Sequence, residues 1–199
     1  MSIEIHPRKI KGKWVEGYAL DLHSVSSSFT GYDGYGHPQF VTTRSEIGEL
    51  LYRLKYRADS HAVGSIAEAV VGFLSKRWPI TVDLIVPVPP SNTARKRQPV
   101  LEVAEEISER SGIRLGTACI TKIKQTPQLK NVYDYKERTA ALENAFAVAA
   151  NETSGQRLLL FDDLFRSGAT MNAITECLIR DGKAGKVFAL TLTRTRSSL

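Results

Sequence analysis

The sequence has little of what metal and redox sites need: 2 cysteines and 4 histidines in 199 residues. Cys119 and Cys177 have no CxxC spacing and no neighbouring histidine, which excludes a zinc ribbon or a redox pair. We expect both cysteines to be small buried hydrophobic side chains. The histidines lie scattered in the first third of the chain, so we expect no metal cage built by the protein.

Long hydrophobic runs are also missing. The longest, such as residues 69–74 and 158–161, are far too short to cross a bilayer, so we expect no membrane partner. The N-terminal residues lack the apolar stretch of a signal peptide, and unpaired cysteines fit a reducing compartment, so a cytoplasmic location is expected. With 42% hydrophobic and 24% charged residues, the composition is that of one folded domain.

The charges are not balanced. Lysine and arginine number 27 and aspartate and glutamate 21, which leaves a formal net charge of +6. An excess of this kind indicates an anionic partner, which could be nucleic acid, a phosphorylated small molecule or an acidic surface.

The N-terminal part shows strand and turn patterns. Residues 13–24 alternate between apolar and polar side chains, which predicts a half-buried strand. The pair Asp33-Gly34 and nearby glycines favour a turn, so residues 13–43 are predicted to form a long hairpin or two short edge strands. Tyr32 and Tyr35 in this turn would either stack on a base or form a solvated hairpin tip.

Two amphipathic helices are predicted between residues 46 and 77, where apolar residues recur at intervals of three and four. Arg53, Lys55 and Arg57 crowd the end of the first helix. They either complement the dipole of that helix or contact phosphate.

After residue 79, short apolar runs alternate with helical patterns. This alternation predicts an α/β fold with a mostly parallel twisted sheet flanked by helices. We expect helices at 99–111 and 169–180, and strands at 82–86, 117–123, 146–150, 157–161 and 186–193. Residues 1–78, with strands and two helices, are predicted to be an extension packed on a core of residues 79–199.

The most informative segment is residues 158–174. A buried strand carries Asp162 and Asp163 to its C-terminal end, where open α/β sheets bind ligands. A short loop with Ser167, Gly168 and Thr170 then begins a helix, whose N-terminal N–H groups favour an anion. This combination suits a sugar phosphate, with its phosphate in the loop and its ribose hydroxyls on the carboxylates.

The same segment resembles the phosphoribosyl-pyrophosphate (PRPP) motif of type I phosphoribosyltransferases, and the resemblance implies their fold, with a flexible hood loop. It implies that Asp162 and Asp163 are catalytic. Arg166 stands where the family often has a small or hydroxyl residue. The residues implied to bind the 5′-phosphate are Arg166, Ser167, Gly168, Ala169 and Thr170.

A second resemblance lies in residues 83–107, where a buried strand ends in a Val-Pro motif and a basic run follows. It is similar to the pyrophosphate loop of the ComF branch, which residues 54–56 also resemble. ComF proteins usually continue with Arg-Gly-Phe-Asn-Gln, whereas this chain has Lys-Arg-Gln-Pro at 96–99. The basic run could instead be solvated. The implied loop residues are Val88, Pro89, Pro90, Ser91, Arg95 and Arg97.

Residues 124–145 are too polar and too long for a minimal turn, which is typical of a functional lid. In type I phosphoribosyltransferases the corresponding segment is a hood over PRPP. Residues 126–129 and 138–144 echo a Thr-x-x-Gln-x-x-Leu, Arg-x-x-Asn pattern of the ComF branch, with altered spacing. The lysines could screen a departing diphosphate or face solvent. The implied hood residues are Lys122, Lys124, Gln128 and Lys130.

The resemblance implies a Mg²⁺-dependent transfer of the phosphoribosyl group from PRPP to a nitrogen acceptor, with release of pyrophosphate. Mg²⁺ would be held through PRPP, with Asp162 and Asp163 nearby. The zinc ribbon of many ComF proteins is missing, and Ser2 after Met1 excludes an N-terminal glutaminase nucleophile. ComF proteins are linked to DNA uptake, so a rival hypothesis is single-stranded DNA binding, or PRPP sensing without turnover. Such enzymes are commonly homodimers.

Overall fold

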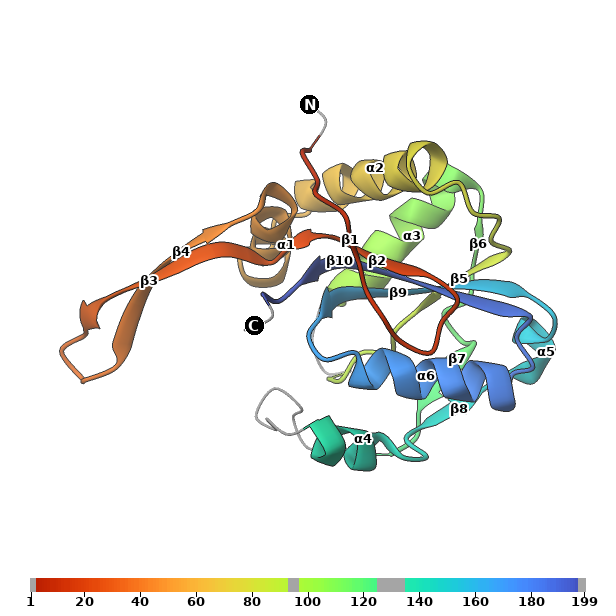
Figure 1. Cartoon of the computed structure of the whole chain (residues 1–199). Helices are drawn as coiled ribbons and strands as arrows, with labels where there is room; N and C mark the ends of the chain where they lie inside the picture. Colours follow the sequence, from red (N-terminus) through yellow and green to blue (C-terminus); the bar gives the residue numbers. More distant parts are fainter. Residues whose placement is uncertain (1–2, 93–96, 125–134, 197–199) are drawn as a thin grey trace.

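A six-stranded sheet forms the centre of the molecule, in a computed structural model that describes residues 3–92, 97–124 and 135–196 (Figure 1). All neighbouring strands are parallel except β1 and β2, which are antiparallel. This topology confirms the predicted fold class. In spatial order the strands are β1 (Arg8–Lys9), β2 (Gly17–Leu22), β10 (Lys186–Arg194), β9 (Arg157–Phe165), β5 (Leu84–Pro87) and β6 (Arg114–Leu115).

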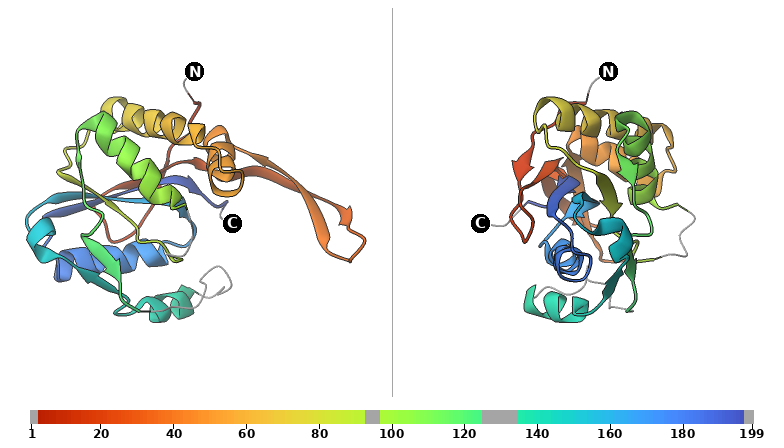
Figure 2. Two further views of the ribbon diagram at one scale, coloured as in Figure 1. Left: turned by 180° about the vertical axis from the view of Figure 1, so that it is seen from behind. Right: turned by 90° about the vertical axis from the view of Figure 1, so that its right-hand side faces the viewer.

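Helices cover both faces of this sheet (Figures 1 and 2). α1 (Glu46–Tyr56), α2 (His61–Lys76) and α3 (Pro99–Ser111) lie on one face, and α6 (Ala169–Arg180) lies on the other. Along β9, Leu159 and Phe161 pack with α1–α3, whereas Leu158 and Leu160 pack with α6. Because both faces of β9 are buried, its sequence is a continuous apolar run rather than an alternating one.

The N-terminal strand differs from its prediction. β2 is an interior strand between β1 and β10, and both of its faces are covered: Ala19 packs on the α6 side and Leu20 on the α1–α3 side. The prediction of a half-buried strand was therefore wrong, because alternation in a single sequence does not show what covers the second face. The sheet extends across residue 78, and the division into 1–78 and 79–199 stays a prediction.

The strands predicted at 117–123 and 146–150 are also placed differently. They form β7 (Ile120–Lys122) and β8 (Phe146–Val148), which pair antiparallel with each other in a separate two-stranded sheet. α4 (Tyr135–Leu142) lies between them in sequence, and α5 (Ala150–Thr153) follows β8. Consecutive strands that return side by side pair antiparallel, whereas a place in the parallel sheet needs a crossover over its face.

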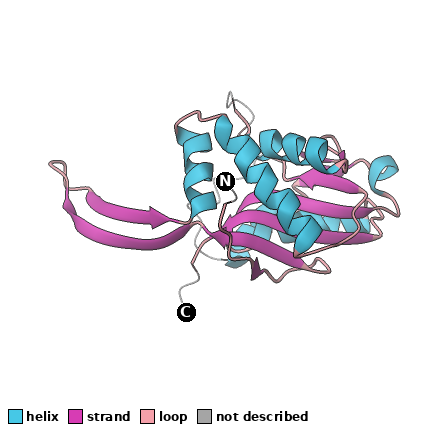
Figure 3. Cartoon of the chain, turned by 90° about the horizontal axis from the view of Figure 1, so that it is seen from above, coloured by secondary structure: helices cyan, strands magenta, loops and turns pink. Residues whose placement is uncertain are grey.

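The predicted hairpin is confirmed for its second part only. β3 (Ser24–Tyr32) and β4 (Pro38–Arg44) pair antiparallel and project away from the sheet (Figure 3). We call residues Ser24–Arg44 the arm. Its turn is closed by the Asp33 carboxylate, which accepts hydrogen bonds from the backbone N–H groups of Tyr35 and His37, each at 2.9 Å.

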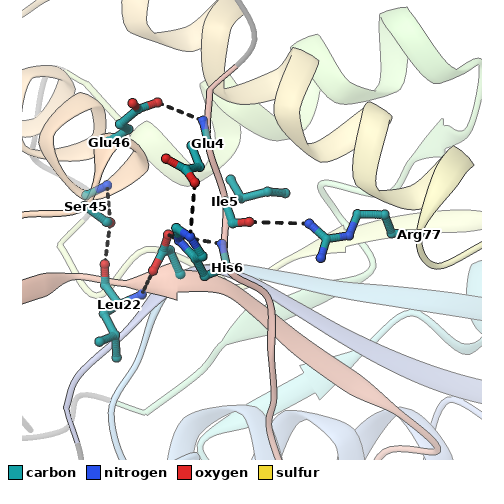
Figure 4. Close-up of polar contacts among 9 residues, drawn as sticks. Glu4, Ile5, His6, Leu22, Ser45, Glu46 and Arg77 are labelled. Atoms are coloured by element: carbon teal, nitrogen blue, oxygen red, sulfur yellow. Dashed lines mark hydrogen bonds and ion pairs between the residues drawn. The ribbon is translucent and has the colours of Figure 1, made fainter.

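The N-terminal segment ties β2 to the helices beside it (Figure 4). The His6 ring lies 3.0 Å from the buried Asp21 carboxylate, and this hydrogen bond raises the pKa of His6. Ser45 begins α1, since its hydroxyl accepts from the Gly48 N–H and donates to the Leu22 carbonyl at 2.5 Å. The start of α1 is thereby fixed to the end of β2.

Asp83 joins the starts of β5 and β9. Its carboxylate accepts from the Arg157 backbone N–H at 2.8 Å and from the Arg157 guanidinium at 2.9 and 2.6 Å. These hydrogen bonds lower the pKa of Asp83 from 3.8 to about 2.

We expect Asp83→Asn to destabilise the protein at neutral pH. A carboxyl with a lowered pKa in the folded state contributes stability that is present above 3.8 and lost as pH falls through about 2. Urea unfolding of both proteins should therefore show a stability difference that shrinks over this range. Glu105→Gln, an exposed carboxylate on α3, is the control. A difference that does not change with pH would contradict the assignment.

Candidate functional site

Asp162 and Asp163 lie near the C-terminal end of β9, as the sequence predicted. β5 and β10 flank them: the Val88 N–H donates to the Phe161 carbonyl at 2.8 Å, and the Thr193 hydroxyl to the Asp163 carbonyl at 3.1 Å. The backbone that carries the two acids is therefore held from both sides. This is the sheet edge at which open α/β folds bind ligands.

Lys55 of α1 reaches this edge from the N-terminal part of the chain. Its ammonium lies 2.5 Å from the Asp163 carboxylate, and both side chains are 18% exposed. The Asp163 N–H donates to the Asp162 carboxylate at 2.8 Å. Burial raises the pKa of Asp162, and the charge of Asp163 raises it further. The pair thus joins a lysine-compensated carboxylate to one whose charge is disfavoured.

His23 also belongs to this cluster. Its ring lies 3.3 Å from the Thr193 hydroxyl, and its N–H donates to the Arg194 carbonyl at 2.8 Å. Burial lowers the pKa of His23, and the positive charges of Lys55 and Arg44 lower it further. Sequence reasoning missed His23, because no motif surrounds it. It singled out the basic stretch around Lys55 without predicting that Lys55 contacts Asp163.

The loop from Phe165 to Ala169 turns sharply into α6. Gly168 has a φ of 77°, and a Cβ there would lie 2.9 Å from the Phe165 ring, so both the backbone and the space require glycine. The first hydrogen bond of the helix runs from the Asn172 N–H to the Gly168 carbonyl at 2.8 Å. The N–H groups before it have no acceptor within the helix, which makes this end suited to an anion.

A cavity of about 110 Å³ lies against this loop. It is several times the volume of one water, about 30 Å³, and well below the roughly 300 Å³ of a pocket for a drug-sized molecule, so it suits one phosphoryl group. Arg138 of α4, which is 9% exposed, lines it as well. The Arg-x-x-Asn echo at 138–144 was the signal for Arg138. The predicted site residues around the cavity are Asp162, Arg166, Ser167, Gly168, Ala169 and Thr170.

The predicted pyrophosphate loop is only partly described. Val88 is buried in the core and Pro89 and Pro90 are half-buried, whereas Ser91 is exposed. The Arg97 guanidinium binds Glu102 and donates to the Ala58 carbonyl at 3.0 Å. Arg97 thus holds the start of α3, and Arg95 lies outside the described residues. A contact of this loop with pyrophosphate stays a prediction.

The predicted hood is described at its two ends. Lys122 lies in β7, where burial lowers its pKa, and Lys124 donates to the Glu143 carbonyl at 3.4 Å. Gln128 and Lys130 lie outside the described residues. An open groove of about 920 Å³ runs between α4 and α6, and Ala169 lines both this groove and the smaller cavity.

Both cysteines are buried, as predicted. Burial raises the pKa of Cys119 to about 12 and that of Cys177 to about 11, so neither is a reactive thiolate at neutral pH. Within the described residues, no three His, Cys, Asp or Glu side chains gather as metal ligands. No helix in the described part of the chain combines the length and apolar character needed to cross a membrane.

Several residues of the basic segments are engaged in ion pairs. Such pairs must be broken, or shared, before these side chains can contact nucleic acid phosphates, which weakens the hypothesis of a basic stripe. The pairs are Lys9–Glu16, Lys13–Glu176, Arg53–Asp59, Lys55–Asp163 and Arg97–Glu102.

We expect Lys55 and Asp163 to be energetically coupled. Their exposure lies between that of surface pairs, worth up to about 1 kcal/mol, and buried pairs, whose disruption costs about 3–5 kcal/mol, so we expect a coupling of about 1–3 kcal/mol. A double-mutant cycle of Lys55→Met and Asp163→Asn, measured by urea unfolding, checks this. Additive effects of the two substitutions would show that the contact contributes nothing.

Comparison with known proteins identifies a relative in sequence. The chain is 28% identical over 153 residues to the competence protein ComFC of Bacillus subtilis (strain 168), a match that covers 74% of this chain. The matched part spans 59% of the length of that relative. This similarity confirms the predicted resemblance to ComF proteins. No protein-family model matches the sequence.

Solved structures with a similar fold include phosphoribosyltransferases. An adenine phosphoribosyltransferase from Thermoanaerobacter pseudethanolicus has a TM-score of 0.45 and 16% identity, over 82% of this chain and 92% of its own. The UMP synthase of Leishmania donovani has a TM-score of 0.40 and 16% identity, over 84% of this chain and 28% of its own.

Proposed function

We propose that this ComF-like chain binds PRPP with Mg²⁺ and transfers its phosphoribosyl group to a nitrogen acceptor, releasing pyrophosphate. One observation carries the proposal: a paired carboxylate and a phosphate-sized cavity adjoin each other at the end of β9. A site for phosphate alone has no need of two acids, and a metal site alone has no need of the α6 N-terminus.

The 5′-phosphate would lie in the cavity at the start of α6. There the first N–H groups of the helix, the Ser167 and Thr170 hydroxyls and the Arg138 guanidinium face the same small volume. Backbone N–H groups and a guanidinium are the donors that phosphate oxygens favour. Since the cavity suits little more than a phosphoryl group, the ribose would lie outside it, over Asp162 and Asp163.

The two carboxylates would accept hydrogen bonds from the ribose hydroxyls. Lys55 limits the negative charge at this edge, which favours approach of a ligand that carries a diphosphate. Carboxylate oxygens also suit Mg²⁺, which would neutralise charge on the diphosphate as it leaves. The donor set of Asp162, Asp163 and the substrate oxygens therefore fits this ion without a protein cage.

In the proposed reaction, the bond between ribose C1 and the pyrophosphate oxygen breaks and a bond from C1 to the acceptor nitrogen forms. The bonding electrons leave with pyrophosphate, and the acceptor nitrogen loses its proton. The protein acts by positioning the ribose and by stabilising developing charge, so no covalent nucleophile is needed. The raised pKa values of Cys119 and Cys177 agree with this.

Isothermal titration calorimetry of the full chain with PRPP tests the proposal. We expect binding that requires Mg²⁺ and exceeds that of ribose 5-phosphate or pyrophosphate alone, because the whole ligand spans both halves of the site. Pyrophosphate release with a panel of nucleobases and amines then separates turnover from sensing. Failure of PRPP to bind with Mg²⁺ would refute the site, and binding without release under any acceptor would refute the transferase reaction.

A further inference from the structure

The arm exposes a cluster of aromatic side chains far from the proposed site (Figure 3). Phe29, Tyr32 and Phe40 are 52%, 71% and 55% exposed. The Phe29 ring lies 5.2 Å from that of Tyr32 and 5.6 Å from that of Phe40, between ring centroids. Phe29 and Phe40 are directly paired across the two strands and therefore share a face. Contiguous exposed apolar surface of this kind marks an interaction site.

The charge of the arm argues against nucleic acid as its partner. From Ser24 to Thr43 the sequence has no lysine or arginine, and Asp33 is its one formally charged residue, in a chain of net charge +6. Proteins that stack bases on aromatic rings combine those rings with a positively charged groove. The arm supplies the rings without the positive charge, so an uncharged protein surface suits it better.

The strands of the arm also lack the devices that protect sheet edges. β3 runs for nine residues without lysine, proline or any charge. Exposed edges normally carry such residues to prevent pairing with another chain. A two-stranded ribbon that packs on nothing is marginally stable, and added strands or a covered face would stabilise it.

We propose that the arm binds the arm of a second copy of this chain, with the faces of Phe29, Tyr32 and Phe40 in contact. A two-fold dimer places the same patch on both subunits, so a neutral apolar face meets an identical neutral apolar face. Two bodies that each carry +6 repel each other at close range. Because the arms project from the bodies, contact through the arms keeps those charges apart and screened by salt (Figure 1).

Analytical ultracentrifugation of the full chain tests this contact, from about 1 µM to about 1 mM, the range of weak to moderate affinities. We expect a monomer–dimer equilibrium that Phe29→Ser with Phe40→Ser weakens at least tenfold. The control is Val15→Ser with Ile123→Ser, which removes two apolar side chains of similar exposure, 64% and 65%, away from the arm. A monomer throughout this range, or equal weakening by both variants, would overturn the proposal.

Disulfide trapping locates the contact. Both native cysteines are buried, so Tyr32→Cys introduces the one exposed thiol among the described residues. With diamide, which takes up the two hydrogens as two thiols form a disulfide, we expect a covalent dimer. Ile123→Cys should give much less. Equal trapping of both variants would overturn the proposal, as would loss of oligothymidine binding in the Phe29→Ser, Phe40→Ser variant of a monomeric chain.

Discussion

Replacing Asp162 and Asp163 together by asparagine is expected to reduce PRPP affinity at least about 100-fold. Each carboxylate would accept a charge-assisted hydrogen bond worth about 1.5–3 kcal/mol, so the loss of two exceeds about 3 kcal/mol. Each 1.4 kcal/mol corresponds to about tenfold in affinity. Calorimetric titration of PRPP in the presence of Mg²⁺ measures the effect.

The fold is expected to survive this double substitution. Asparagine has nearly the shape of aspartate, and neutralising Asp162 removes a charge that burial disfavours. Only the contact of Lys55 with Asp163 is lost, so thermal unfolding should show a modest change. Glu105→Gln with Glu109→Gln removes two exposed carboxylates from α3 and should leave PRPP binding intact. Undiminished PRPP binding by the Asp162→Asn, Asp163→Asn variant would refute the site.

Gly168→Ala is expected to weaken PRPP binding about 10- to 100-fold, because displaced positioning groups commonly cost about this much. Its φ of 77° is unfavourable for alanine, and its Cβ would push the Phe165 ring, which lines the cavity. Stability should also fall, by about 1–2 kcal/mol for the backbone conformation and about 1–3 kcal/mol for the crowding. Titration with PRPP and urea unfolding measure the two effects separately.

Gly36→Ala on the arm is a matched control. Its φ of 80° is nearly that of Gly168, but a Cβ there meets nothing within 4 Å. It should therefore show the backbone cost alone, with PRPP binding unchanged. If Gly168→Ala behaved like Gly36→Ala in both measurements, the loop after β9 would have no part in phosphate binding.

The part of the candidate site that could be predicted is continuous in sequence. Asp162, Asp163 and the loop through Thr170 lie within one strand–loop–helix unit, so local pattern and the parallel-sheet rule place them together. Arg138, Lys55 and His23 come from three other segments, and only packing brings them to the end of β9. Their positions depend on how α4, α1 and the end of β2 meet β9, which no local pattern contains.

The same division holds for the whole chain. The sequence alone determined the α/β class, the buried cysteines and the phosphate loop, because each follows from residues that are near neighbours along the chain. Tertiary structure alone decided that β2 is an interior strand, that β7 and β8 leave the main sheet, and that Lys55 compensates Asp163. These depend on which faces are covered and which strands meet, and contacts between residues distant in sequence determine both.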